Sequence, residues 1–497
     1  MKKMVLVLLF VIFALSLLPF SSCKGGTGPD GAANGNEAGI AKADDAEPEN
    51  QAGYDSLPAF DYKGADFAIG NIEGWAWVDV TLDYDAEESG ELLSDAIYRR
   101  NRAVEEKYNI TFKIIPIPGD DMGNKAKTQM LAGSCEIEIM QAPTRVVAAL
   151  TPDNFIADAN RLENIDLKNP WWDDFALSSM SICGKQFFLY GDFTIADKEY
   201  ATVIFLNREL QKKYALPDYY QIVREGKWTI DTMLESMKVA TVDLNGDGKW
   251  TKDDQYGHVT NVYSMMQVFY GAGETIIKKD RDDMPYFAID DEPYLNAFFK
   301  MCEFLNTDNT TFDAMGNGSH QDEMFAEGKG LFDSSLLAAM RAPKENQRGM
   351  EYDFGILPPP KLNEQQENYY SYCDGSTPCI AILNHDADRV ARSAVILEAL
   401  NAKSSEAVAP KYMEYALPLK YFRDDESFEM FDIILKHRIF DIGASYGWGD
   451  FVAGNSGKMR DLLVRNKPDQ VSSTIEKNLV KGTESMNRDI EKILALG

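Results

Sequence analysis

The stretch that decides the fold class is residues 88–115, ESGELLSDAIYRRNRAVEEKYNITFKII. Its first part places apolar residues at helical spacing, at Leu93, Ala96, Ile97, Val104 and Tyr108, and predicts a helix over about 88–108. The β-branched run Ile110–Ile115 predicts a strand that ends at Pro116. A helix that leads straight into a strand is a building unit of α/β proteins.

The same alternation continues on both sides of this stretch. Strands are predicted at 65–70, 137–141, 187–190, 201–207, 354–357 and 380–383, and helices at 124–132, 229–242, 389–402 and from about 438 to the end. Strands that alternate with helices favour a mostly parallel sheet. Because we find no internal repeat and no low-complexity linker within 59–497, we predict two α/β lobes built from interleaved segments.

The composition narrows the range of partners. The chain of 497 residues is 45% apolar and carries 79 Asp and Glu against 50 Lys and Arg, a net charge of −29. An acidic surface without a basic stripe repels phosphate backbones, so we expect no nucleic acid partner. The four histidines do not lie at metal-ligand spacing and the six cysteines form no CxxC pair, which excludes the usual zinc and thioredoxin-like motifs.

The N-terminus has the pattern of an export signal. Met1-Lys2-Lys3 precedes an apolar run from Met4 to Leu18, which is short for a spanning helix. Ser21-Ser22-Cys23 is similar to a bacterial lipobox, in which the cysteine is acylated, with Phe20 where Leu is usual. We predict a lipid anchor on Cys23, and an ordinary secretory signal cut nearby is the alternative.

A tether and several thiols follow the predicted anchor. Residues 24–56 are rich in Gly, Ala, Asn, Asp and Glu, which predicts a flexible tether that holds the body just off the membrane. The remaining cysteines are Cys135, Cys183, Cys302, Cys373 and Cys379. Cys373 and Cys379 are close enough in sequence for a small loop disulfide, and we expect buried free thiols at the others.

One loop has the ligand spacing of an EF-hand-type calcium site. Residues 243–254 read DLNGDGKWTKDD, and the predicted ligands are Asp243, Asn245, Asp247, the carbonyl of Lys249, and Asp254. Gly248 permits the sharp turn of such a loop. We predict a structural Ca²⁺ here, and an acidic turn in a surface hairpin is the alternative.

Several short stretches combine aromatic side chains with carboxylates, at 73–79, 171–174, 190–193, 372–374 and 446–450. A sugar packs its C–H face on an aromatic ring while carboxylates accept its hydroxyl hydrogens, so this combination favours a carbohydrate ligand. A tryptophan buried in the core is the alternative at each position, and we expect Trp171-Trp172 to pack between segments. Pairs of acids alone do not indicate a glycosidase, and the chain has no GxSxG elbow and no Walker A loop.

Four parts of the chain resemble the extracellular solute-binding proteins of bacterial ABC importers, in the family-1, maltose-binding-like group. The matching motifs are DAIYRRNRAVEEKYN (95–109), GDF (191–193) with IFLN (204–207), GKWTID (226–231), and FAEGKG (325–330) with FGILPPPK (354–361) and QENYYS (366–371). Their order along the chain is that family's order, over about residues 60–450.

The resemblance implies a periplasmic-binding-protein-like type II fold, in which crossing hinge strands join two α/β lobes and the ligand cleft lies between them. The implied parts are a signal peptide (1–22), the acylated Cys23 with its tether (23–58), the first lobe (59–195), the second lobe with the calcium-like loop (196–358), a return to the first lobe (359–435) and helices packing on the second lobe (436–497). The crossings are expected at 190–202 and near 357–372.

The resemblance also implies a function. The protein would be a substrate-binding lipoprotein and not an enzyme: it captures an extracytoplasmic carbohydrate, an oligosaccharide by preference, by lobe closure and delivers it to ABC permease subunits. We expect a monomer held at the membrane by its lipid alone. The predicted ligand contacts are Trp75, Trp77, Glu88, Gln141, Asp192, Asp374 and Trp448. A polysaccharide-capturing lipoprotein without a permease and an exported glycoside-active enzyme are the alternatives.

Overall fold

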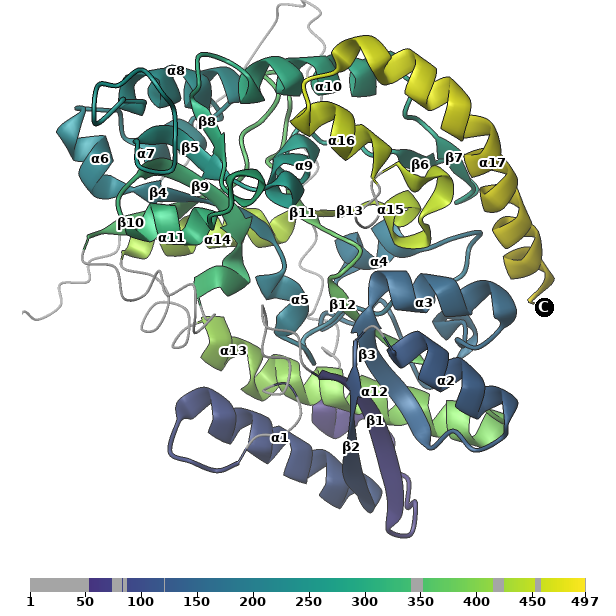
Figure 1. Cartoon of the computed structure of the whole chain (residues 1–497). Helices are drawn as coiled ribbons and strands as arrows, with labels where there is room; N and C mark the ends of the chain where they lie inside the picture. Colours follow the sequence, from purple (N-terminus) through teal and green to yellow (C-terminus); the bar gives the residue numbers. More distant parts are fainter. Residues whose placement is uncertain are drawn as a thin grey trace, which may run out of the picture. The chain divides into compact units, whose positions relative to one another are not determined.

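Two β-sheets, each with its own helices, organise the chain (Figure 1). The computed structural model describes residues 53–73, 83, 87–119, 121–340, 352–413, 424–451 and 457–496. The predicted signal peptide and Cys23 lie outside the described residues, as do Trp75 and Trp77. Within the described residues, no helix is long and apolar enough to cross a membrane.

The first sheet has the strand order β12-β3-β1-β2. Its strands are β1 (Ala65–Glu73), β2 (Ile110–Pro118), β3 (Ile137–Pro143) and β12 (Pro378–Ile382). β1 pairs in parallel with β2 and β3, whereas β12 pairs antiparallel with β3. The helices that accompany it are α1 (Leu92–Tyr108), α2 (Met122–Leu131), α3 (Thr144–Leu150), α4 (Asp174–Met180), α12 (Ala387–Ala407) and α13 (Ala409–Lys411). We call this assembly the first lobe.

The second sheet has the strand order β10-β4-β9-β5-β8. Its strands are β4 (Thr202–Asn207), β5 (Tyr256–Thr260), β8 (Thr311–Asp313), β9 (Gly330–Leu336) and β10 (Phe354–Leu357). β5 pairs in parallel with β8 and β9, and β4 pairs antiparallel with β9 and β10. Its helices are α6 (Arg208–Lys213), α7 (Tyr219–Arg224), α8 (Ile230–Ala240), α9 (Val262–Tyr270), α10 (Glu292–Leu305), α11 (Gln321–Ala326) and α14 (Asp425–Lys436). With the hairpin of β6 (Ile277–Lys279) and β7 (Pro285–Phe287), they form the second lobe.

Short segments connect the two lobes. Residues 190–202, which include α5 (Ala196–Glu199), lead from the first lobe into β4. β11 (Ser371–Cys373) leads back toward β12 and pairs in parallel with β13 (Arg438–Phe440). We call 190–202, β11 and β13 the hinge segments.

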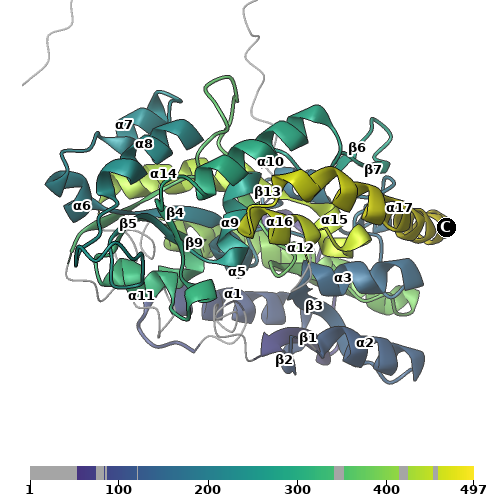
Figure 2. The ribbon, with the colours of Figure 1, turned by 45° about the horizontal axis from the view of Figure 1, so that its top comes forward.

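The C-terminal helices contact both lobes. After α15 (Ile442–Tyr446), α16 (Lys458–Val464) packs on α9 and α10 of the second lobe, and α17 (Val471–Ala495) runs along one side of the body (Figures 1 and 2). The end of α17 reaches the first lobe, where Lys492 Nζ lies 2.8 Å from Asp153 Oδ1. The predicted packing on the second lobe alone therefore does not describe these helices.

Short 3₁₀ helices complete the secondary structure of the described residues, at Tyr54–Ser56, Thr151–Asp153, Ala159–Arg161, Met315–Asn317, Leu337–Met340, Trp448–Asp450 and Pro468–Gln470.

The first of these 3₁₀ helices, Tyr54–Ser56, lies within the predicted tether. Tyr54 is only 5% exposed, and its hydroxyl donates to the Ala103 carbonyl of α1 at 2.8 Å. Packing therefore begins several residues before the predicted boundary at 59.

Several local predictions differ from the structure. Both sheets are mixed rather than mostly parallel. β2 continues through Pro116 to Pro118 because it is an edge strand, where a missing N–H costs no ladder bond. Residues 187–190 make only an isolated bridge between Leu189 and Ile380. Residues 425–435, predicted for the first lobe, belong to α14, which lies beside β10 of the second.

Helix α12 positions the first hinge segment. The Asn401 Oδ1 of this helix accepts the backbone N–H of Phe193 at 3.0 Å. A Cβ at Gly191 would lie 2.2 Å from the same Oδ1, so the close approach of hinge and helix requires glycine there.

Candidate functional site

A buried ion cluster joins the hinge segments to the first lobe. Arg438 of β13 lies 2.8 Å from Asp197 of α5 and also pairs with Asp173, which caps α4. Burial alone would lower the pKa of Arg438, but the two carboxylates raise it overall. The guanidinium therefore stays charged and fixes β13 against residues 190–202.

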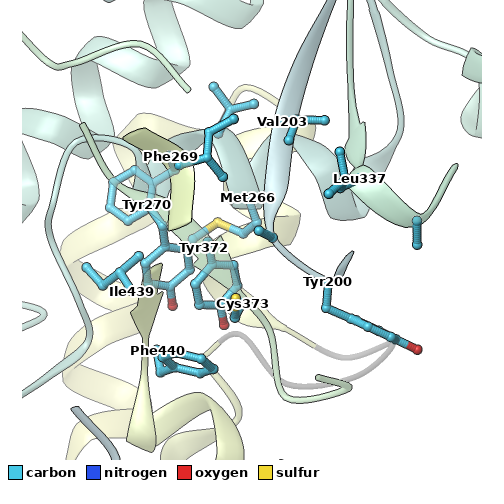
Figure 3. Close-up of a cluster of buried hydrophobic side chains, with 14 of the residues drawn as sticks. Tyr200, Val203, Met266, Phe269, Tyr270, Leu337, Tyr372, Cys373, Ile439 and Phe440 are labelled. Atoms are coloured by element: carbon cyan, nitrogen blue, oxygen red, sulfur yellow. The ribbon is translucent and has the colours of Figure 1, made fainter. Parts of the chain in front are cut away.

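Two stacked tyrosines lie at the other hinge strand (Figure 3). The rings of Tyr270, at the end of α9, and Tyr372, in β11, are 3.8 Å apart between centroids and inclined by only 11°. The Tyr270 hydroxyl donates to Asp441 Oδ2 at 2.9 Å, and the Ile276 backbone N–H donates to the same oxygen at 2.7 Å. Helix α9 is thus attached to both β11 and the residue that follows β13.

Polar side chains from both lobes meet beside β11. Asp374 follows β11 directly, and its Oδ1 accepts the Ser376 backbone N–H at 2.7 Å. Arg145, at the start of α3, donates from Nη1 to Ser376 Oγ at 2.8 Å. Gln267 of α9 lies close enough to the Asp374 carboxylate to favour its charged form and so lower its pKa. We call Arg145, Gln267, Asp374 and Ser376 the inter-lobe cluster.

The inter-lobe cluster is short of hydrogen-bond donors. Gln267 is 5% exposed, and its Oε1 has no hydrogen-bond partner within the described part of the chain. Burial raises the pKa of Asp374, although Ser376, Arg145 and Gln267 each lower it. An unsatisfied buried oxygen is costly, so a ligand or water that donates to it is favoured here.

An exposed aromatic ring stands at the carboxyl end of β5. Asn261 caps α9 by accepting the N–H of Tyr263 at 2.8 Å, which places Tyr263 in the first turn of the helix. This ring is 40% exposed, and the Arg460 guanidinium lies 5.0 Å from its centroid. Met315 follows the adjacent strand β8 and is 44% exposed.

The predicted ligand contacts are not gathered in one place. Glu88 is exposed and pairs with Arg99 at 3.0 Å. Gln141 is 1% exposed and donates to Asp83 Oδ2 at 3.1 Å. Asp192 lies in the first hinge segment, where burial raises its pKa. Of the described contacts, only Asp374 belongs to the inter-lobe cluster.

Trp448 is placed as a structural side chain. It is 2% exposed, and its ring stacks on Tyr446 with centroids 4.6 Å apart. Its Nε1 donates to Asp489 of α17 at 2.9 Å. This environment corresponds to the buried alternative considered for each tryptophan.

The sequence reasoning did not select Arg145, Gln267 or Tyr263. Ligands of α/β proteins bind beyond the carboxyl ends of strands, and Gln141 was selected because β3 was predicted to end there. β3 ends two residues later, at Pro143, and Arg145 follows it. Asn261 before the apolar run of α9 is an N-cap signal that indicates the helix start and hence Tyr263.

The calcium-like loop folds back on itself. The Asp243 carboxylate accepts the N–H groups of Gly246 at 2.7 Å and Gly248 at 2.8 Å, and Asp254 accepts those of Leu244 and Thr251. Asn245 and Asp247 each accept an N–H two residues on, at 2.8 and 2.7 Å. Across the described residues, no group of three or more His, Cys, Asp or Glu side chains is gathered closely enough to hold a metal ion. A cation in this loop therefore requires its carboxylates to turn inward.

The cysteines of the body are free thiols. Cys135, Cys183, Cys302, Cys373 and Cys379 form no disulfide. The loop disulfide considered for Cys373 and Cys379 is therefore absent. Both thiols are buried, and burial raises their pKa.

A surface pocket of about 310 Å³ lies on the second lobe, between α6, α7 and α14. Its basic residues are already paired, Arg208 with Asp424 and Lys212 with Glu209. None of the inter-lobe cluster residues lines it. We therefore place the candidate site at the inter-lobe cluster.

Comparison with known proteins identifies the fold. No protein-family model matches the sequence, and no curated protein matches it. An ABC substrate-binding protein from Listeria monocytogenes, solved with cycloalternan, is 13% identical, and the match covers 87% of this chain and 100% of that one with a TM-score of 0.53. An extracellular solute-binding protein from Staphylococcus aureus, solved with maltose, is 13% identical over 86% and 98% of the two chains, with a TM-score of 0.56. UspC of M. tuberculosis is 14% identical over 84% and 100%, also with a TM-score of 0.56.

These structures cover almost the whole body of the chain and are covered by it almost completely. The predicted arrangement of two α/β lobes joined by crossing hinge strands is confirmed. The chain therefore has the type II periplasmic-binding-protein fold, the fold of the maltose-binding-like substrate-binding proteins of ABC transporters.

Proposed function

We propose that this protein is the carbohydrate-binding component of an ABC importer and performs no covalent chemistry. The observation that carries the proposal is the inter-lobe cluster. Gln267 comes from the second lobe, whereas Arg145 and Asp374 belong to segments of the first. A ligand held by these side chains touches both lobes at once.

The chemistry of the cluster suits a polyhydroxyl ligand. The Asp374 carboxylate and the Gln267 Oε1 accept hydrogen bonds from hydroxyl groups. The Arg145 guanidinium balances the charge of Asp374, so a neutral sugar meets no net charge. The exposed face of Tyr263 offers an apolar surface to the C–H face of a pyranose. Sugars in the structures of similar fold support the same ligand class.

Binding and release follow from two lobe arrangements. A ligand that contacts both lobes binds the closed arrangement better and shifts the population toward it. The hinge segments carry the change because they are the connections between the lobes. The closed form would then deliver its sugar to the permease subunits.

We also propose the cellular setting predicted from the N-terminus. An acylated Cys23 and the tether would hold a monomeric body outside the cytoplasm, close to its permease. In the calcium-like loop, Asp243, Asn245, Asp247, the Lys249 carbonyl and Asp254 would hold a Ca²⁺ that stiffens the surface.

A thermal-shift screen of the body, residues 53–497, tests the proposal. Maltose, linear maltodextrins and cyclic glucans are added at millimolar concentration, and binding to the native state raises the melting temperature. Asp374→Asn and Gln267→Ala each weaken binding of the responding sugar at least about tenfold, since each removes a buried acceptor. Asp432→Asn, the same change on the exposed face of α14, leaves affinity unchanged.

The negative outcomes are specific. No melting shift with any oligosaccharide contradicts a carbohydrate ligand. Equal affinity in Asp374→Asn, Gln267→Ala and Asp432→Asn contradicts the location of the site. Release of a chemically altered sugar would show an enzyme instead.

A further inference from the structure

One buried aspartate joins helix α9 to helix α15. Asp441 follows β13 and is 2% exposed. Its Oδ2 accepts the Tyr270 hydroxyl at 2.9 Å and the Ile276 backbone N–H at 2.7 Å. Its Oδ1 caps α15 by accepting the N–H groups of Gly443 at 2.9 Å and Ala444 at 3.3 Å. The carboxylate therefore holds the end of α9 and the start of α15 at a fixed spacing.

Tyr270 fixes the rotation of α9 about its own axis. Tyr263, Gln267 and Tyr270 stand at positions i, i+4 and i+7, so they share one face of the helix. The ring of Tyr270 is stacked on Tyr372, and its hydroxyl is bonded to Asp441. Because these two attachments hold Tyr270 in place, they also set the direction in which Gln267 and Tyr263 leave the helix.

The stacked ring of Tyr270 reaches another part of the inter-lobe cluster through β11. Its partner Tyr372 lies two residues before Asp374, and the two ring centroids are 3.8 Å apart (Figure 3). The Asp374 carbonyl accepts the Thr377 N–H at 2.9 Å in the turn that follows β11. A shift of Tyr270 therefore moves the Asp374 carboxylate as well as Gln267.

Helix α15 extends the same constraint to the start of α3. Ser445 Oγ donates to Thr144 Oγ1 at 3.1 Å, and Thr144 precedes Arg145 directly. A Cβ at Gly375 would lie 3.6 Å from the Ala444 carbonyl oxygen, an ordinary van der Waals distance, so Gly375 lies against α15. The Arg145 N–H donates to the Gly375 carbonyl at 3.1 Å. Helix α15 thus supports both first-lobe segments of the inter-lobe cluster.

We propose that Asp441 is a positioning residue of the sugar site, which sets the spacing between Gln267, held through Tyr270, and Arg145, held through α15. The proposal rests on the proposed function, since it concerns the same site. Side chains that bond a ligand must be held within about 0.5 Å of their working positions. A buried carboxylate with four donors supplies that precision without contacting the ligand itself.

The test compares Tyr270→Phe with Tyr220→Phe in the body, residues 53–497. Both side chains are buried, and each hydroxyl bonds an aspartate that caps a helix. Tyr270 bonds Asp441 of α15 at 2.9 Å, and Tyr220 bonds Asp424 of α14 at 3.1 Å. Tyr220 lines the surface pocket, which contains none of the inter-lobe cluster residues. Both variants keep the aromatic ring, so each removes one matched hydrogen bond.

The probe is whichever of maltose, the linear maltodextrins and the cyclic glucans gives the largest melting shift with the wild type. We expect Tyr270→Phe to bind it at least about fivefold more weakly, because Gln267, Tyr263 and Asp374 are no longer held in register. Tyr220→Phe should bind it as the wild type does, although both variants melt at a lower temperature. Wild-type affinity in Tyr270→Phe shows a bond that serves the fold alone and overturns the proposal.

Hydrogen exchange of the sugar-free protein separates this inference from the proposed function. The N–H groups of Arg145 and Thr377 are bonded within the segments that Asp441 is proposed to position, at 3.1 and 2.9 Å. They should exchange at least about fivefold faster in Tyr270→Phe than in the wild type, whether or not any sugar binds. In Tyr220→Phe they should exchange at the wild-type rate.

Exchange at the wild-type rate in Tyr270→Phe overturns the role of Asp441, even when sugar binding itself is established. Faster exchange in a protein that binds no sugar supports the positioning and contradicts only the proposed function. If Tyr270→Phe does not fold, Ser445→Ala removes the bond from α15 to Thr144, leaves Asp441 in place, and must show the same two signs.

Discussion

Arg438 Nη1 lies 2.8 Å from Asp197 Oδ2, and both side chains are almost completely buried between the two lobes. The pair joins β13 to the first hinge segment, and Asp173 extends it to α4. A charge this deeply buried persists only with its partners, because desolvation of an unpaired ion is costly. The hinge is therefore defined by electrostatics as well as by packing.

Arg438→Met should destabilise the protein strongly. The substitution removes the buried guanidinium that pairs with Asp173 and Asp197 and leaves Lys198, 3.6 Å from Asp197, as the nearest cation. Breaking a buried ion pair in this way typically costs about 3–5 kcal/mol. Urea unfolding measures the loss, and Arg99→Met, at an exposed pair with Glu88, should leave the free energy of unfolding almost unchanged. Equal costs for the two variants would contradict a buried ion cluster at the hinge.

Glu398 should make stability depend on pH. Asn169, Trp171 and Trp172 donate to its carboxylate at 2.6, 3.2 and 3.0 Å, yet burial raises its pKa to about 7. The native state therefore holds a proton between pH 4.5 and about 7 that the unfolded chain has released. The contribution of Glu398 to stability is complete below this range and decreases as pH rises, by up to about 1.4 kcal/mol per pH unit.

The measurement is urea unfolding from pH 4.5 to 8, with indole fluorescence of the native state as a second signal. Glu398→Gln cannot titrate and should give a flatter pH dependence. The fluorescence of the wild type should titrate with a midpoint near 7, and that of the variant should not. Identical profiles for both proteins would contradict the raised pKa.

Trp448→Phe should affect the fold rather than the ligand. The change removes the hydrogen bond to Asp489 but keeps an aromatic ring against Tyr446, so we expect a loss of about 1 kcal/mol. Sugar affinity should stay within twofold of the wild type, whereas Tyr263→Ala should weaken it about tenfold. If a binding titration shows weaker sugar binding for Trp448→Phe and unchanged binding for Tyr263→Ala, Trp448 and not Tyr263 contacts the ligand.

Chelation should test the calcium-like loop. If Ca²⁺ binds the native state, EDTA lowers the melting temperature, and a metal at a hundred times its dissociation constant contributes about 2.7 kcal/mol. Asp247→Asn should melt at one temperature with or without EDTA. Asp253→Asn changes an acid of the same loop outside the predicted ligand set and should keep the full response. If EDTA does not change the melting temperature of the wild type, the loop holds no structural Ca²⁺.

Much of the fold could be predicted from local patterns. The period of the apolar residues located α1 and α12 closely, because each packs one face on a core. The short apolar run 354–357 located β10, which is buried along its whole length. The antiparallel pairing was not predicted. The direction in which two strands pair depends on the path of the chain between them, and the local spacing of apolar residues carries no information about that path. Residues 187–190 carry strand-like residues, but only Leu189 finds a partner strand.

The site was harder to predict than the fold. Asp374 was selected from its place in an aromatic and acidic stretch, and it does lie between the lobes. Trp448 came from the same kind of stretch but is buried under α17. An aromatic residue in such a stretch can pack in a core as readily as it can contact a ligand, so the sequence pattern does not separate the two roles. Gln267 could not have been found, because its role arises from the contact of α9 with a segment more than a hundred residues away.

Small-angle X-ray scattering of the body with a saturating oligosaccharide, after the thermal-shift screen has found one that binds, would be decisive for sugar capture by lobe closure. We predict a smaller radius of gyration in the bound state, with the sugar recovered chemically unchanged. A saturated protein whose radius stays the same, or a sugar returned in cleaved or modified form, would contradict it.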